Sequence, residues 1–419
     1  MRTHRLHRLR RHLYQMYHTR PLGWLLAVIL MAGLDCTTSG TSTISISTSR
    51  SRSRSRSCCC MAWNVNRRTF LQSVAVTTAT TIATPASASS PPASRLLYTP
   101  PPLHGKTIVI TGGNTGLGLE SAKRLAAVGA TVMVTTRTDA KGVRAVRDIR
   151  DYLRERGMGD DDNVYARTLD LCDLRQVRKV ASDIVHEGIQ IDVLLNNAGV
   201  MALPDRQLTV DGYERTFQTN HLGHFAWTAT LFPALKPSAR IINVSSEGYR
   251  FAAPGLQIDN LNGERRYGPW ISYGQSKLSN ILFTQELHRR VVAAGKSYTV
   301  VTLHPGVVAT DLGRYLVGEE KWNRMRNEGM TWPEKLVFVP LANAFTKTVS
   351  EGADTQIYLA AAAIDADSDG NDTTAFIRGG SFYENRKPHP LQPFARDPRA
   401  AEALWQISEQ MTGVRFDGL

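Results

Sequence analysis

The stretch Thr111-Gly112-Gly113-Asn114-Thr115-Gly116-Leu117-Gly118 decides the fold class of this chain. It follows an apolar, β-branched run at 107–111 and precedes a helical pattern at 119–128. Glycines between a strand and a helix permit a tight turn and let a diphosphate approach the backbone at the helix N-terminus. A plain glycine-rich turn without a ligand is the alternative. The residues predicted to line a dinucleotide here are Gly112, Asn114, Thr115, Gly116, Leu117 and Gly118.

Short β-branched runs alternate with helical patterns along the rest of the chain. The pattern predicts strands at 131–135, 164–171, 192–196, 240–245 and 299–304, and helices at 139–156, 174–187 and 273–294. Such alternation is typical of βαβ units, and runs of Val, Ile and Leu suit strands buried on both faces. We therefore predict an α/β fold, a Rossmann-type doubly wound parallel sheet. It forms a single domain over 103–419, after a leader over 1–99.

The leader has the composition of targeting sequence rather than of a domain. Its apolar run at 22–34 is shorter than the roughly 20 residues that span a bilayer and fits a signal-peptide core. The Ser/Thr-rich segment 37–57 ends in Arg-Ser alternation and resembles an organelle transit peptide. The segment 66–88, with Arg67-Arg68, resembles a twin-arginine export signal.

Two targeting signals in series predict a destination reached in two steps. We expect an organelle-targeted or exported protein, with a plastid and its thylakoid favoured and cleavage near Ala88. Another membrane-associated or secretory compartment is one alternative. A start at Met61, which would leave only the second signal, and a disordered leader are the others.

Charge and cysteine are concentrated in the leader. The formal net charge is +13, but residues 1–100 hold 13 Arg, no Lys and one Asp, which leaves the rest of the chain at +1. A protein that binds nucleic-acid phosphates needs basic clusters in its folded part, so we expect no nucleic-acid partner. Cys172 is the only cysteine of the body, so the body has no internal disulfide.

The end of the second predicted strand bears on the choice of dinucleotide. An NAD site places an acidic residue there to hold the ribose 2′-hydroxyl. The chain instead has Thr135, Thr136 and Arg137, and Arg137 lies 19 residues after Gly118. A guanidinium can bind a 2′-phosphate bidentately, which favours NADP(H). A solvated Arg137 without a ligand is the alternative.

Two further patterns carry polar chemistry. Asn196-Asn197-Ala198-Gly199 ends an apolar strand, and buried amides are costly unless hydrogen-bonded, so these residues brace the sheet or lie beside the cofactor ribose. Tyr273 and Lys277 are spaced i, i+4 and share one helix face. A neighbouring ammonium favours the phenolate, which would allow proton exchange with a substrate oxygen near neutral pH. Ser245-Ser246 ends the strand at 240–245.

Taken in order, these motifs resemble the short-chain dehydrogenase/reductase family. The resemblance rests on TGGNTGLG, NNAG, Ser246 and Tyr273-Gly274-Gln275-Ser276-Lys277, and covers about 103–419. The stretches 219–225 and 276–283 and the triplet His304-Pro305-Gly306 resemble its retinol-dehydrogenase-like branch, with protochlorophyllide reductase more distant.

The resemblance implies roles for individual residues. Tyr273 would be the general acid/base, and Lys277 would lower its pKa and bind the nicotinamide ribose. Ser246 would hydrogen-bond the substrate oxygen, with Ser245 as the alternative, and Asn220 would hold a water in a proton relay to Lys277. The remaining cofactor-binding residues implied are Asp170 at the adenine side, Asn197, Ala198 and Gly199, and Pro305, Gly306 and Thr310 at the nicotinamide side.

These observations predict an NADP(H)-dependent oxidoreductase that interconverts a carbonyl and an alcohol on a small or apolar, retinoid- or lipid-like substrate. An NADPH-binding regulator or scaffold without turnover is the alternative. The apolar stretch 312–340 is either a lid over the substrate or a packing helix. Besides its substrate, the expected partners are a membrane surface and a second copy in a homodimer. His221 and His224 lack a third ligand, so we expect no metal.

Overall fold

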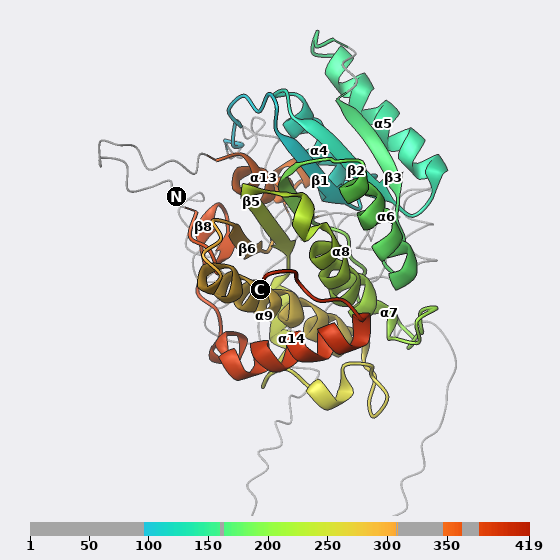
Figure 1. Ribbon diagram of the computed structural model, residues 1–419, viewed down its shortest axis with the longest axis vertical. Helices are drawn as coiled ribbons and strands as arrows, with labels where there is room; N and C mark the ends of the chain where they lie inside the picture. Colours follow the sequence, from blue (N-terminus) through green and yellow to red (C-terminus); the bar gives the residue numbers. More distant parts are fainter. Residues whose placement is uncertain (1–95, 160–162, 307, 309–346, 363–376) are drawn as a thin grey trace, which may run out of the picture. The chain divides into compact units, whose positions relative to one another are not determined.

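The computed structural model describes residues 96–159, 163–306, 308, 347–362 and 377–419 (Figure 1). Within them, the chain from Leu96 onward forms one compact unit. The predictions for the leader, for Thr310 and for the stretch 312–340 lie outside the described residues. No helix in the described ranges is long and apolar enough to cross a membrane.

The described residues build one eight-stranded sheet with the order β3-β2-β1-β4-β5-β6-β7-β8. All neighbouring strands run parallel except β7 and β8. The strand order reverses between β1 and β4, which is where doubly wound folds bind ligands at the carboxyl ends of the strands. The strands are β1 Thr107–Thr111, β2 Thr131–Thr136, β3 Val164–Thr168, β4 Ile191–Asn196, β5 Leu235–Val244, β6 Thr299–Leu303, β7 Phe382–Glu384 and β8 Lys387–Pro388.

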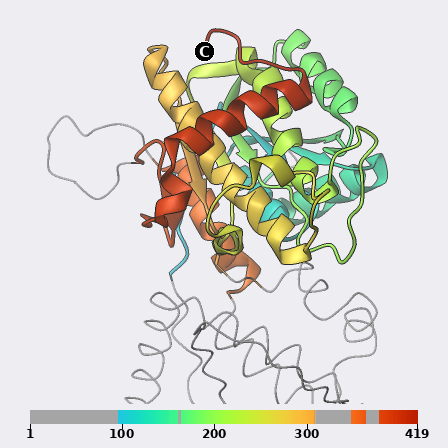
Figure 2. The same cartoon turned by 90° about the horizontal axis from the view of Figure 1, so that it is seen from below.

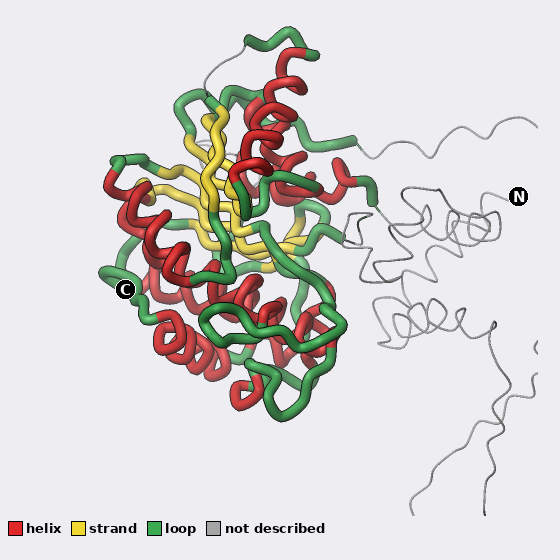
Figure 3. Tube along the Cα trace, turned by 90° about the vertical axis from the view of Figure 1, so that its right-hand side faces the viewer, coloured by secondary structure: helices red, strands yellow, loops and turns green. Residues whose placement is uncertain are grey.

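Helices cover both faces of the sheet (Figure 3). The α-helices are α4 Gly116–Ala126, α5 Asp139–Arg154, α6 Leu174–His186, α7 Arg215–Phe217, α8 Gly223–Leu231, α9 Pro269–Ala293, α13 Val349–Ala361 and α14 Pro398–Thr412. One face packs against α4, α5 and α13, and the other against α6, α8 and α9. The last helix, α14, crosses the outer side of α9 (Figure 2).

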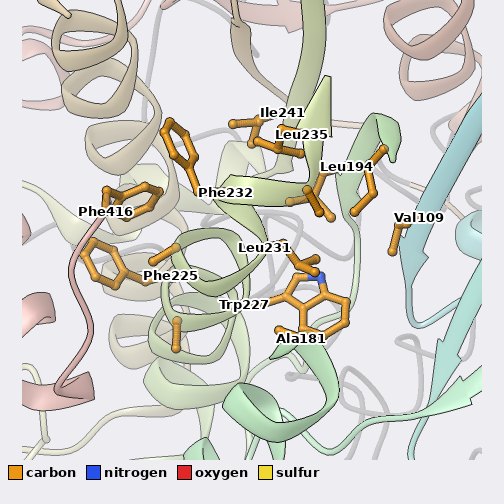
Figure 4. Close-up of a cluster of buried hydrophobic side chains, with 14 of the residues drawn as sticks. Val109, Ala181, Leu194, Phe225, Trp227, Leu231, Phe232, Leu235, Ile241 and Phe416 are labelled. Atoms are coloured by element: carbon orange, nitrogen blue, oxygen red, sulfur yellow. The ribbon is translucent and has the colours of Figure 1, made fainter. Parts of the chain in front are cut away.

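The alternation of side chains along β1 explains the two layers. Ile108 and Ile110 belong to the core beneath α4 and α5, whereas Val109 belongs to the core beneath α6 and α8. That second core also holds Phe225 and Trp227 of α8 (Figure 4). Every strand of the sheet centre is buried on both faces, as its continuous apolar sequence predicts.

The predicted fold class is confirmed, and the elements differ from the prediction at particular places. Helix α4 begins at Gly116 rather than at 119, so the end of the glycine motif already lies in the first helical turn. Strand β5 begins at Leu235, five residues before the predicted start. The helix α8 was not predicted because almost all of its residues are buried, which removes the polar face that reveals a helical period.

Candidate active site

The glycine turn after β1 approaches its surroundings too closely for side chains. A Cβ on Gly118 would lie 2.5 Å from the carbonyl oxygen of Gly112 and 2.6 Å from Nδ2 of Asn197. Gly112 also has φ of +66°, a conformation that favours glycine. The turn is therefore a backbone surface, in which Asn114 is half-buried and Thr115 exposed.

Helix α4 begins without a polar cap. Its N-cap residue Thr115 makes no side-chain cap hydrogen bond, and its first turn carries no acid. By contrast, Thr138, Asp173 and Asp397 cap the starts of α5, α6 and α14 with their side chains. Uncapped N–H groups at a helix N-terminus, together with the helix dipole, suit a diphosphate. The turn that contains Gly116, Leu117 and Gly118 thus fits the predicted ligand.

Asn197 and Ala198 hold the glycine turn in place. The side chain of Asn197 donates to the carbonyl of Thr111 (2.8 Å). The backbone N–H groups of Asn197 and Ala198 both donate to Oγ1 of Thr111 (2.9 and 3.0 Å). Asn196 is different, because it braces the sheet by donating to Thr228 and Asn243. Bracing is therefore shown for both asparagines, and a place for Asn197 beside the cofactor ribose stays a prediction.

Arg137 and Asp170 follow neighbouring strands at the carboxyl edge. Arg137 is exposed directly after β2. The nearest acid in sequence, Asp139, accepts a hydrogen bond from Thr168. Asp170 is half-buried after β3, and its carboxylate accepts from the backbone N–H of Cys172 (2.9 Å). A cation, rather than an acid, therefore stands exposed at the end of β2.

Ser246, Tyr273 and Lys277 form a buried polar group. Tyr273 is 6% exposed and Lys277 is 4% exposed. Ser246 hydrogen-bonds the Tyr273 hydroxyl. The Lys277 ammonium lies 5.8 Å from the centre of the Tyr273 ring and donates to the carbonyl of Val244 (3.0 Å). A serine hydroxyl, a phenol and an ammonium thus meet where β5 ends.

Burial dominates the electrostatics of this group. Burial raises the pKa of Tyr273 to about 12, against the opposing hydrogen bond from Ser246. Burial also lowers the pKa of Lys277 to about 8. Desolvation of the phenolate therefore sets the direction of the Tyr273 shift, and the expected lowering of that pKa by Lys277 stays a prediction. At neutral pH the tyrosine carries its proton.

The long segment between Ser246 and Tyr273 folds back onto the site. Ser246 caps the 3-10 helix Glu247–Ala252 by accepting from the N–H of Gly248 (3.0 Å). A Cβ on Gly248 would lie 2.7 Å from the Tyr273 ring. The alternative serine, Ser245, is buried, and its hydroxyl donates to the carbonyl of Lys277 (2.7 Å).

Asn220 lies in a π-helical turn, Gln218–Leu222. Its amide exchanges hydrogen bonds with the backbone of Val200 and donates to Ser276 (2.9 Å). A Cβ on Gly199 would lie 3.1 Å from Oδ1 of Asn220 and 3.4 Å from Nζ of Lys277. Asn220 and the Lys277 ammonium therefore both lie beside Gly199.

His224 is a site residue that the sequence did not reveal as one. Oγ1 of Thr111 accepts two backbone N–H groups, so its hydrogen is directed to Nε2 of His224 (2.8 Å). Nδ1 of His224 then donates to the carbonyl of Asn220 (3.0 Å). Burial lowers the pKa of His224 to about 4, so the ring is neutral at physiological pH. His224 thereby joins the glycine turn to the helix that carries Asn220.

His221 has a separate partner, Ser408 (2.8 Å). No group of three or more His, Cys, Asp or Glu side chains in the described ranges could hold a metal ion. At the other side of the site, the carbonyl of Pro305 accepts from Lys347 (2.9 Å), and the N–H of Gly306 donates to His304 (3.0 Å). The predicted cofactor residues thus follow β1, β2, β3, β4 and β6 at one edge.

Residues 106–321 match the family described as short chain dehydrogenase. The chain belongs to that family. Among curated relatives, it is 39% identical to Retinol dehydrogenase 14 of Mus musculus over 322 residues, which cover 74% of this chain and 87% of the relative. It is 35% identical to Retinol dehydrogenase 12 of Homo sapiens over 317 residues, covering 75% and 89%. The chain therefore lies in the retinol-dehydrogenase-like branch.

A crystal structure of an uncharacterized protein from Mycobacterium Paratuberculosis is 35% identical, with a TM-score of 0.56, and the match covers 77% of this chain and 99% of that one. Family membership makes the chain an oxidoreductase of alcohol and carbonyl groups that binds a nicotinamide cofactor.

Proposed function

We propose that this protein is an NADP(H)-dependent oxidoreductase that reduces a carbonyl, or oxidises the corresponding alcohol, of an apolar substrate. The observation that carries the proposal is the group of Ser246, Tyr273 and Lys277 at the end of β5, at the same edge of the sheet as a glycine turn that has no room for side chains. A Cβ on Gly199 would lie within 3.4 Å of both Asn220 and the Lys277 ammonium, so Asn220 belongs to the same group.

Residues along the carboxyl edge would hold the dinucleotide. The first turn of α4 would bind the diphosphate, Arg137 the 2′-phosphate, and Asp170 the adenine side. Lys277 would bind the nicotinamide ribose, with Asn197 and Ala198 supporting the turn. Bound NADPH would supply the hydride that reduces the carbonyl carbon.

The chain supplies the proton. In reduction, Tyr273 donates its hydroxyl proton to the substrate oxygen as the C–O double bond becomes a C–O–H single bond. Its pKa of about 12 keeps that proton in place until the oxygen gains charge. Ser246, which already hydrogen-bonds the phenol, would hold the same oxygen in position. Lys277 and Asn220 would return a proton to Tyr273 through water.

The preference for NADP(H) rests on Arg137. An exposed guanidinium at the end of β2 matches a phosphate, and Thr168 already donates to Asp139, the nearest acid in sequence. An NAD site would place a carboxylate at this position instead.

The preference for an apolar substrate rests on the aromatic surroundings of the phenol. Trp270 lies three residues before Tyr273 on α9, with its ring 6.4 Å from the tyrosine ring, and Phe251 lies 5.5 Å from Trp270. Rings of this kind line apolar ligand sites. The curated relatives named above are retinol dehydrogenases, in agreement with an apolar isoprenoid or lipid-like substrate.

The leader completes the proposal. We infer that 103–419 is the catalytic domain and that the leader is cleaved near Ala88 on delivery to an organelle or on export. N-terminal sequencing of the native protein tests this. A mature N-terminus near residue 89 is expected, and an intact leader on a cytosolic protein would contradict it.

A cofactor and substrate panel tests the enzyme itself. The purified protein is assayed for oxidation of NADPH and of NADH against apolar and polar aldehydes and ketones. We expect turnover with NADPH and an apolar carbonyl, and weaker activity with NADH. Tight NADPH binding with no turnover on any carbonyl would instead support a dinucleotide-binding regulator.

A further inference from the structure

His304 follows β6 at the edge where the catalytic serine emerges. Leu303 of β6 pairs with Val244 of β5, and the N–H of Ser245 donates to the carbonyl of Leu303 (2.7 Å). His304 is therefore the first residue beyond β6, and Ser246 is the second residue beyond the neighbouring strand β5. His304 is 3% exposed, and its ring stacks on Phe382 of β7 at 5.5 Å.

One hydrogen bond determines which nitrogen of His304 carries the proton. The backbone N–H of Gly306 donates to Nδ1 at 3.0 Å. An N–H group can only donate, so Nδ1 is an acceptor, and a neutral ring carries its hydrogen on Nε2. Nε2 faces a carboxylate oxygen of Glu384 at 3.3 Å and one of Glu247 at 3.8 Å.

Other residues hold both carboxylates toward this ring. The second oxygen of Glu384 lies 3.2 Å from Nδ1 of His389. Burial alone would raise the pKa of Glu384, but its hydrogen bond with His304 lowers that pKa. Arg250 pairs with Glu247. An ionised Glu384 therefore accepts from Nε2 and stabilises the tautomer that leaves Nδ1 to Gly306.

A second side chain holds the turn from its other side. Lys347 donates to the carbonyl of Pro305 (2.9 Å) and to Oδ1 of Asn385 (2.8 Å). Gly306 has φ of +88°, and a Cβ there would lie 2.8 Å from the Lys347 side chain. The turn Pro305-Gly306 is thus clamped between a histidine and a lysine from different parts of the chain.

The clamped turn lies between the two ends of the dinucleotide site. On one side is Ser246, at the end of the neighbouring strand. On the other side, a Cβ on Gly352 would lie 2.5 Å from the side chain of Val308 and 2.9 Å from that of Leu117. Val308 follows the clamped turn, and Leu117 belongs to the glycine turn. The backbone that follows His304 therefore passes from the catalytic serine toward the diphosphate cradle.

We propose that His304 is a positioning residue that fixes the Pro305-Gly306 turn against the nicotinamide end of the cofactor, with Glu384 selecting its tautomer. This inference rests on the proposed function, since it assumes a dinucleotide in the site. The proposed role depends on one hydrogen bond, in which the backbone N–H of Gly306 donates to Nδ1 of His304.

Three substitutions distinguish the contact of Nδ1 with Gly306 from the contact of Nε2 with Glu384. In His304→Asn, the amide oxygen replaces Nδ1 as acceptor for Gly306, and the contact with Glu384 is lost. In His304→Gln, the amide nitrogen can still reach Glu384, but no acceptor remains for Gly306. His304→Phe keeps only the stacking on Phe382.

The measurement is the dissociation constant for NADPH of the full chain, together with hydrogen exchange of the Gly306 amide after ¹⁵N-glycine labelling. We expect His304→Asn to bind within about threefold of wild type and to keep Gly306 protected. His304→Gln and His304→Phe should bind about tenfold more weakly, about 1.4 kcal/mol, with Gly306 exchanging rapidly. If His304→Phe does not fold, the Asn and Gln variants carry the comparison, and their melting temperatures are measured alongside.

Two results would overturn the inference while leaving the proposed function intact. One is wild-type affinity and wild-type Gly306 protection in His304→Gln. The other is an equal loss of affinity in His304→Asn and His304→Gln, which would indicate a general packing role. A wild-type protein that does not bind NADPH would overturn the proposed function and this inference together.

Discussion

At the end of β1 the site is formed by a glycine-rich backbone turn, whereas at the ends of β5 and β6 it is formed by buried polar side chains. The turn at Gly112 and Gly118 has no room for a Cβ, and α4 begins without a side-chain cap. Beyond β5 and β6, by contrast, Tyr273, Lys277 and His304 are all at most 6% exposed and all hydrogen-bonded.

The difference indicates how each region fails. A substitution in the glycine turn adds atoms against Gly112 and Asn197, so it displaces the turn and weakens cofactor binding and turnover together. A substitution in the catalytic group removes one polar atom from a packed surrounding, so it can abolish turnover while the cofactor still binds. Measurements that report binding and rate separately can therefore distinguish the two regions.

The largest effect is expected at the phenol. Tyr273→Phe keeps the ring that packs on Gly248 and removes the proton donor. We expect kcat to fall by about 10²–10⁴, the usual contribution of general acid–base catalysis, with the NADPH dissociation constant nearly unchanged. Steady-state kinetics and a cofactor titration check this. Turnover within a few-fold of wild type would remove Tyr273 from the mechanism.

The two adjacent serines provide a matched pair. Ser246→Ala removes the hydroxyl that bonds Tyr273, and we expect kcat to fall by about 10², as for loss of one donor to a reacting oxygen. Ser245→Ala removes a hydroxyl that bonds the Lys277 carbonyl, so it should lower the melting temperature more than kcat. The reverse pattern would assign the catalytic role to Ser245.

A smaller effect is expected from an added methyl group in the glycine turn. In Gly118→Ala the new Cβ would meet the Gly112 carbonyl at 2.5 Å. Overpacking typically costs about 1–3 kcal/mol, so NADPH should bind about 30-fold more weakly. Gly295→Ala is the control for general destabilisation, since its φ of +65° strains an alanine although a Cβ there meets nothing within 4 Å. Equal losses in both variants would indicate general destabilisation instead.

The smallest effect is expected at the edge of the cofactor site. Arg137 is exposed, so solvent screens its charge. Arg137→Ala should weaken NADPH binding about tenfold and leave NADH binding unchanged, because a charged hydrogen bond contributes about 1.5 kcal/mol. Titration of both cofactors into wild type and variant gives the ratio. A preference that survives the substitution would place the phosphate elsewhere.

The sequence predicts the features whose signals are local. The glycine turn, NNAG and the i, i+4 pair Tyr273 and Lys277 are each written in a few consecutive residues, and the structure places each as that pattern implies. Helix α8 was missed because it is buried all round. The partners of His304 were missed because Glu247 and Glu384 come from distant segments.

The pKa of Tyr273 also cannot be predicted from a few consecutive residues. The neighbouring ammonium is visible in the sequence and argues for a low pKa. The burial that raises the pKa to about 12 depends on Gly248, Trp270 and the packing of the whole segment before α9. Local spacing therefore identifies the two groups, whereas the fold determines the burial that shifts the pKa of each.

A single-turnover experiment with deuterated cofactor tests the central claim most directly. Stoichiometric complex of the full chain with NADPH labelled at the transferable hydrogen is mixed with an apolar aldehyde from the panel. Mass spectrometry then measures the label in the product. The account predicts one deuterium on the alcohol carbon with wild-type protein and almost none with Tyr273→Phe, although both bind NADPH. Binding of NADPH by the wild type without transfer of label to any carbonyl would contradict it.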